Sequence, residues 1–142
     1  MKYLLFIAVI TIFVGTVCAQ DDVNPIDKKL DKCLETAKGT MPRAECYSAA
    51  SEAWEKDITT TYAALIKKLT ALGHDSVRLK QLITSSQSAW VKYRDAQFAV
   101  FSDEYGQKRG TGYIIPRITM RIDVIRPRAL ELENELGMYS TN

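Results

Sequence analysis

The sequence is poor in the residues on which most enzymes and metal sites depend. It has one histidine, His74, which stands beside Gly73 where we expect a solvated turn. One histidine rules out an HExxH zinc motif or a histidine cluster and gives no plausible catalytic triad. Neighbouring carboxylates such as Glu52, Glu55 and Asp57 are interleaved with lysine, as is typical of a solvated helix face. The sequence therefore predicts a protein that is not an enzyme and holds no metal ion or cofactor.

Neither sign of charge predominates, and long apolar runs are scarce. The chain has 19 basic and 17 acidic side chains, which gives no electrostatic surface for nucleic acid or an anionic membrane. Beyond the N-terminal segment, no stretch reaches the roughly 18 consecutive apolar residues of a membrane span. The glycines of residues 106–112 follow a predicted helix and lack the spacing of a phosphate-binding loop. These absences leave protein binding as the expected kind of function.

The N-terminus has the features of a secretory signal peptide. Lys2 supplies a positive charge, residues 3–14 are almost wholly apolar, and Val17 and Ala19 stand three and one positions before Gln20. We expect cleavage after Ala19, which would remove residues 1–19. The mature chain, residues 20–142, has the length of one domain, and we expect it to be periplasmic or secreted.

Two consequences of the N-terminal segment concern lipid and charge. A lipoprotein signal with lipid attached at Cys18 is the alternative, but Val17 is bulkier than the small residue such a signal has before its cysteine. Cleavage after Ala19 removes Lys2, so the mature chain has 18 basic against 17 acidic side chains and a net charge of +1.

The mature chain keeps two of its three cysteines, Cys33 and Cys46. In an oxidising compartment an even pair of cysteines predicts a disulfide rather than a free thiol, which disfavours a cysteine nucleophile. Closing a loop of this length stabilises a fold by about 3 kcal/mol in the chain-entropy model. We therefore expect one disulfide between Cys33 and Cys46.

Apolar residues recur at helical spacing along the whole mature chain. A short first helix begins with Asn24 as its cap and Pro25 at its first position, and the pattern ends at Gly39. A second helix, capped by Thr40, carries a stripe that runs to Gly73. This stripe comprises Tyr47, Ser51, Trp54, Ile58, Tyr62, Leu65, Leu69 and Leu72.

Two further stripes predict the rest of the fold. The third helix directs to one side Leu79, Leu82, Ile83, Ser86, Trp90, Tyr93, Gln97, Val100, Phe101 and Tyr105. The fourth carries Ile115, Ile118, Ile122, Ile125, Ala129, Leu132 and Leu136, with Pro127 inside it as the expected site of a kink. Three long helices joined by short turns predict an all-α, up-and-down bundle, with the short first helix attached at one end by the disulfide.

The connection at residues 106–112 is the most partner-like feature. Its three glycines surround Lys108 and Arg109. A flexible loop at one end of a rigid bundle could bring these cations to carboxylates in a partner's cleft. The alternative is a long helix connection kept soluble by two cations.

Residues 87–95 concentrate aromatic and polar side chains within the third predicted helix. Trp90 and Tyr93 are three residues apart and share a face. We expect both to be core residues, with Arg94 paired to a carboxylate on a neighbouring helix and fixing the register of the helices. In the alternative interpretation, part of this cluster reaches a partner surface.

At these residues the sequence resembles the LprI-type lysozyme-inhibitor family, a group of small exported bacterial domains. The family pattern of glutamine, Ala-Trp and Tyr-Arg-Asp stands here as Gln87, Ala89, Trp90, Tyr93, Arg94 and Asp95. Outside this motif the resemblance includes Cys33, Cys46, Tyr62 and Arg128, and it covers about residues 33–132. The family often has a second cysteine pair that this chain lacks, since Phe98 stands near one position and the last helix has no cysteine.

The resemblance implies a binding protein that blocks the active-site cleft of a lysozyme. Animal lysozymes of the common type look strongly basic, so a nearly neutral inhibitor would gain little electrostatic steering towards them. Affinity would then depend on shape and on cations such as Lys108 or Arg109 meeting the two catalytic carboxylates. The alternative function is a structural or adaptor module that binds another protein of the cell envelope.

Overall fold

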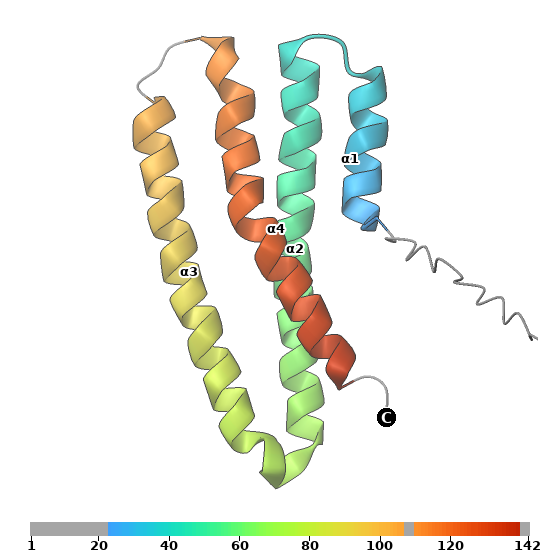
Figure 1. Ribbon diagram of the computed structural model, residues 1–142, viewed down its shortest axis with the longest axis vertical. Helices are drawn as coiled ribbons and strands as arrows, with labels where there is room; N and C mark the ends of the chain where they lie inside the picture. The colour runs from blue at the N-terminus through green and yellow to red at the C-terminus, as the bar shows by residue number, and fades with distance from the viewer. Residues whose placement is uncertain (1–22, 107–109, 140–142) are drawn as a thin grey trace, which may run out of the picture.

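The computed structural model describes residues 23–106 and 110–139, so the predicted signal peptide lies outside the described residues. The elements of the described chain are α1 (Pro25–Thr36), α2 (Thr40–Ala71), η1 (Gly73–Ser76), α3 (Val77–Gly106), η2 (Thr111–Tyr113) and α4 (Ile114–Met138). The three long helices run up and down, and α1 lies beside α2 on the side away from α3 (Figure 1). In these residues every regular element is helical, and the predicted all-α bundle is confirmed.

The core lies between α2 and α4. Its fully buried side chains are Trp54, Leu65 and Leu69 of α2 with Ile125, Ala129 and Leu132 of α4. All six belong to the two predicted stripes, because positions three and four apart share one helix face. Burying each of the larger side chains stabilises the fold by about 1.5–3 kcal/mol. At its C-terminal end the α2 stripe leaves the core, since Leu72 is exposed.

Pro127 lies inside α4, as the sequence predicted. A proline cannot donate a hydrogen bond to the carbonyl four residues earlier, here that of Asp123. The ribbon of α4 changes direction along its length, as expected for a helix with an internal proline (Figure 1).

Of the predicted helix caps and turns, one is confirmed and two differ in the structure. The Asn24 side chain accepts a hydrogen bond of 2.9 Å from the Ile26 backbone N–H and caps α1, as predicted. The prediction for Thr40 is wrong: Gly39 is the cap residue of α2, with φ of 90°, and makes no side-chain capping bond. The expected tight turn after α2 is the 3-10 helix η1, in which the buried hydroxyl of Ser76 donates to the Leu69 and Gly73 carbonyls.

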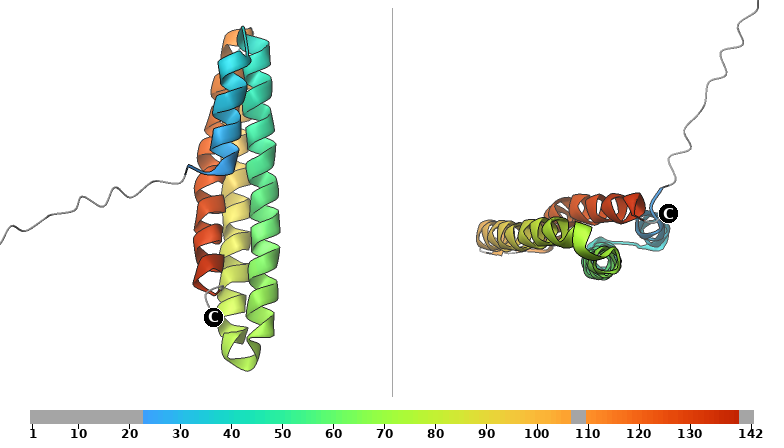
Figure 2. Two further views of the ribbon diagram at one scale, coloured as in Figure 1. Left: turned by 90° about the vertical axis from the view of Figure 1, so that its right-hand side faces the viewer. Right: turned by 90° about the horizontal axis from the view of Figure 1, so that it is seen from below.

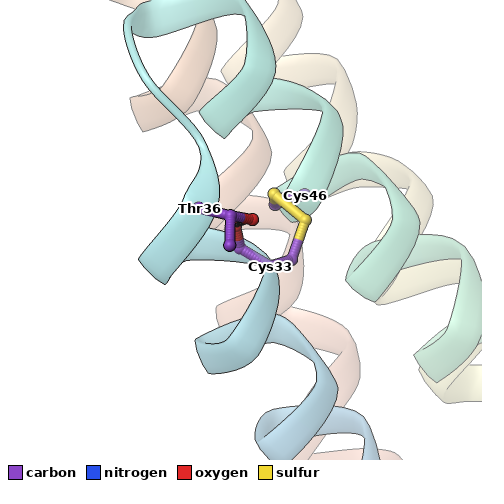
Figure 3. The surroundings of a disulfide bond; sticks show 3 residues. All are labelled: Cys33, Thr36 and Cys46. Carbon is purple, nitrogen blue, oxygen red and sulfur yellow. Dashed lines mark hydrogen bonds between the residues drawn. A yellow bond between two sulfur atoms is a disulfide. The ribbon is translucent and has the colours of Figure 1, made fainter.

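A disulfide and an ion pair link α1 to the bundle, and Ile26 and Leu30 pack against its core. The disulfide joins Cys33 of α1 to Cys46 of α2, with their Cα atoms 5.8 Å apart (Figure 3). On the other side, Arg126 of α4 donates from Nε and Nη2 to Asp27 at 3.0 and 2.7 Å, and these hydrogen bonds raise the pKa of Arg126. The predicted Cys33–Cys46 disulfide is confirmed, and α1 contacts both core helices.

α3 packs less deeply than the other two long helices. Ile83 is its one buried residue among those described, and Leu79, Trp90 and Phe98 are only partly buried against the core. The predicted single stripe is wrong for Leu82, Tyr93 and Val100, which are exposed. These three residues lie on a neighbouring face of the helix, so α3 has one apolar face towards the core and a second towards solvent.

Removing the disulfide should destabilise the mature chain. We expect replacement of both Cys33 and Cys46 by alanine to lower the free energy of unfolding by about 3 kcal/mol, because the unfolded chain regains the entropy of an open loop. Urea unfolding of residues 20–142 measures the change. Reduced wild-type protein should match the double variant, and two free thiols in the unreduced protein would contradict the pairing.

Glu133 of α4 should make stability depend on pH. Burial and the nearby negative charge of Asp57 raise the pKa of Glu133, although its hydrogen bond with Asn24 acts in the opposite direction. A raised pKa in the folded state means that protons bind more tightly there than in the unfolded chain. The stability linked to Glu133 is therefore present at low pH and is lost as pH rises through its folded-state pKa.

Glu133→Gln should remove this dependence. We expect the variant to be more stable than wild type at pH 7, by less than about 1 kcal/mol because the side chain is partly exposed, and to lose that advantage as pH falls. Thermal melts between pH 4 and 7 test the trend. Glu52→Gln, at an exposed carboxylate on α2, is the matched control. If Glu133→Gln were more stable than wild type by the same amount at pH 4 and pH 7, the raised pKa of Glu133 would not be the cause.

Candidate functional site

Two of the residues that carry the family resemblance meet across a helix interface. Arg128 of α4 is only 4% exposed, and its Nε donates a 3.0 Å hydrogen bond to Oε1 of Gln87 on α3. Its Nη1 also forms a 2.8 Å ion pair with Glu131, one turn along the same helix. A guanidinium with fixed planar donors sets the position of its partners. This contact fixes α3 against α4.

The expected role of Arg94 in helix register is therefore taken by Arg128. Arg94 pairs with Asp95, the next residue of its own helix, at 2.7 Å. Its guanidinium also lies over the rings of Trp90 and Phe98, with Cζ 5.4 and 5.9 Å from their centroids. The prediction that Arg94 pairs with a carboxylate on a neighbouring helix is wrong. Its ion-pair partner and the aromatic rings under its guanidinium all belong to α3.

The other motif residues divide between the core and the surface. Trp90 is partly buried against the core, whereas Tyr93 is 54% exposed and is not the core residue that we predicted. Ala89 is exposed as well. Tyr62 donates from its hydroxyl to Oγ1 of Thr84 at 3.3 Å and so links α2 to α3.

Lys108 and Arg109, the predicted partner-binding cations, lie outside the described residues. The helix ends on either side of them, at the end of α3 and the start of η2, are described. Figure 1 shows both at the same end of the bundle as the turn between α1 and α2. Any surface built around this connection therefore includes the first turns of α2 and α4.

A groove occupies this end of the bundle. It encloses about 420 Å³ and is lined from three helices, by Met41, Ala44, Glu45 and Ser48 of α2, Phe98, Phe101 and Ser102 of α3, and Ile114, Arg117, Ile118 and Arg121 of α4. A second hollow of about 270 Å³ shares Ser48, Ile118 and Arg121 with it and adds Glu52 and Glu55. We call the two together the end groove.

The end groove has cations on one wall and carboxylates on the other. Arg117 and Arg121 stand one helical turn apart on α4, both exposed. The guanidinium of Arg121 lies over the ring of Phe98, with Cζ 4.3 Å from the centroid. Within the described part of the chain, neither arginine forms an ion pair with a carboxylate.

The sequence analysis overlooked Arg117 and Arg121. Their spacing of four residues, just after the 106–112 connection, was a usable signal because it places both on one helix face. Their closeness to Phe98 and Glu45 depends on how α2, α3 and α4 pack, and that could not be read from spacing. The carboxylates Glu52 and Glu55 line the groove, whereas Asp57 is half-buried near Glu133.

Across residues 23–106 and 110–139, histidine, cysteine and acidic side chains do not gather in a group that could hold a metal ion. None of the helices in these ranges is both long and apolar enough to cross a membrane.

Arg128 and Arg94 should differ sharply in their effect on stability. We expect Arg128→Ala to lower the free energy of unfolding by about 3 kcal/mol, because it leaves a cavity in place of a side chain that is 4% exposed and removes the hydrogen bond to Gln87. Arg94→Ala should cost about 1 kcal/mol or less, because its ion pair lies within one helix and is partly exposed. Chemical denaturation measures both, and equal losses would refute the role given to Arg128.

Comparison with known protein families gives a match over most of the chain. The model of one protein family, described as "Lysozyme inhibitor LprI", matches residues 33–132, from the first cysteine of the disulfide to the last core leucine of α4. Searches of the curated proteins and of the solved structures give no match. Because the family model covers well over half of the chain, the protein belongs to the LprI lysozyme inhibitor family.

Proposed function

We propose that this protein is an exported inhibitor that binds a lysozyme and blocks its active-site cleft. The family match over residues 33–132 is the observation that carries this proposal. Lysozymes cleave glycosidic bonds with two carboxyl groups that flank the scissile bond. A protein that places cations between these carboxyl groups would exclude the polysaccharide.

The end groove offers a surface of the right chemistry for such contact. Arg117 and Arg121 project from α4 without a carboxylate partner among the described residues. An arginine can donate two parallel hydrogen bonds to a carboxylate, and such charge-assisted bonds are about twice as strong as neutral ones. Lys108 and Arg109, just before η2 in the chain, would extend the same cationic surface.

The opposite wall of the end groove suits the remainder of a basic enzyme. Glu45 and Glu52 are exposed on α2, and Glu55 lies beside them at the hollow's edge. These carboxylates would face cations around a lysozyme cleft while the arginines face its carboxyl groups. Opposite charges on two walls set the orientation of a complex more than its total affinity.

Export is part of the proposal. Residues 1–19 have the charge and apolar pattern of a secretory signal, with cleavage expected after Ala19. The disulfide between Cys33 and Cys46 suits an oxidising compartment. A periplasmic or secreted protein would meet a lysozyme before that enzyme reaches the cell wall.

Direct titration tests the function. The oxidised mature chain, residues 20–142, is added to lysozymes of the animal and invertebrate types, with cell-wall lysis and heat of binding measured in parallel. We expect inhibition of lysis together with one-site binding for at least one type. The absence of both signals at tens of micromolar would contradict the inhibitor proposal and favour the envelope adaptor.

Two double variants locate the surface. We expect Arg117→Ala with Arg121→Ala, and Lys108→Ala with Arg109→Ala, each to weaken inhibition by about tenfold or more, since each removes charge-assisted contacts. The matched control is Lys56→Ala with Lys67→Ala, which removes two exposed charges of α2 outside the end groove. Melting temperatures should stay close to wild type, and equal inhibition by all variants would place the binding surface elsewhere.

A further inference from the structure

α3 carries a second stripe of apolar and small side chains that faces solvent. Its members are Leu82, Ser86, Ala89, Tyr93, Ala96 and Val100, at successive steps of 4, 3, 4, 3 and 4, and every one is exposed. The three largest, Leu82, Tyr93 and Val100, are 56%, 54% and 54% exposed. From the helical rise, the stripe is about 27 Å long. Steps that alternate between three and four are those of a helix that packs along another helix.

The described helices do not cover this stripe. α3 stands at one edge of the molecule and α1 at the opposite edge, in the face view and in the view from below (Figures 1 and 2). α2 and α4 contact the neighbouring face of α3, which holds Ile83, Trp90 and Phe98. Among residues 23–106 and 110–139, no element packs on the outward stripe.

The stripe is symmetric about its own midpoint at position 91. Two antiparallel copies related by a two-fold axis there would place Leu82 opposite Val100, Ser86 opposite Ala96, and Ala89 opposite Tyr93. The small Ala89 would leave room for the ring of Tyr93 from the second copy, twice in the interface. A two-fold interface requires one patch to be complementary to itself in this way.

Charges at the two ends of the stripe favour the same arrangement. Arg78 lies one turn before Leu82 and Glu104 one turn after Val100, and both are exposed. The same antiparallel register brings Arg78 of each copy opposite Glu104 of the other. A parallel pairing would instead place like charges together at both ends, which is unfavourable.

We propose that the outward stripe of α3 is the interface of a symmetric antiparallel dimer, in which a second copy of this chain covers it. The end groove opens between α2, α4 and the other face of α3, so the dimer leaves it accessible. Because the groove lies at the C-terminal end of α3, the two grooves of the dimer would face in opposite directions. One dimer could then engage two partner molecules.

Sedimentation velocity of the oxidised mature chain over a wide concentration range tests the dimer. We expect a reversible change from the monomer mass to twice that mass as concentration rises. Ala89→Glu places a carboxylate beside the two-fold axis and should weaken association by at least tenfold. Ala63→Glu, at an exposed alanine on α2, is the matched control and should associate like wild type.

The charged ends test the register. Arg78→Glu should weaken association, and adding Glu104→Arg should restore it, because the exchange rebuilds both ion pairs only in the antiparallel arrangement. Circular dichroism and melting temperature verify that each variant is folded. A monomer at every concentration, a dimer indifferent to Ala89→Glu, or no rescue by the double exchange would overturn the proposal.

Discussion

Trp54, Leu65 and Leu69 of α2 form one fully buried cluster with Ile125 and Leu132 of α4, and the other helices are attached to this pair. The cluster supplies the main hydrophobic stabilisation, since burial of each of these side chains contributes about 1.5–3 kcal/mol. α1 and α3 pack partly buried side chains against this core, among them Leu30 of α1 and Trp90 of α3. Each is also attached by specific bonds.

Those bonds differ in kind on the two sides of the core. α1 is fixed by the Cys33–Cys46 disulfide and by the Asp27–Arg126 ion pair. α3 is fixed through the buried guanidinium of Arg128 and its hydrogen bond to Gln87. Such directional contacts set position and register more than they add stability. Large parts of α3 stay uncovered in this arrangement. Both the end groove and the outward stripe of α3 include such uncovered residues.

The end groove and the outward stripe use different faces of α3. Phe98 and Phe101 face α2 and α4 and line the groove beside Arg117 and Arg121, whereas Tyr93 and its stripe face solvent. A single helix can thus serve one partner through its end and a second copy of the chain through its side. The family motif spans both faces, which explains why its aromatic residues do not share one environment.

The sequence by itself determined the helices, the disulfide and the buried stripes of α2 and α4, because apolar periodicity and cysteine pairing are local signals. The sequence also indicated that Pro127 lies inside α4 and that Asn24 caps α1. Tertiary structure alone decided that Arg128 rather than Arg94 joins α3 to α4, that Tyr93 is exposed, and that Arg117 and Arg121 share a groove with Glu45. α3 carries apolar side chains on two neighbouring faces, which residue spacing alone had merged into one predicted stripe. Which face is buried depends on the angle at which α3 meets its neighbours.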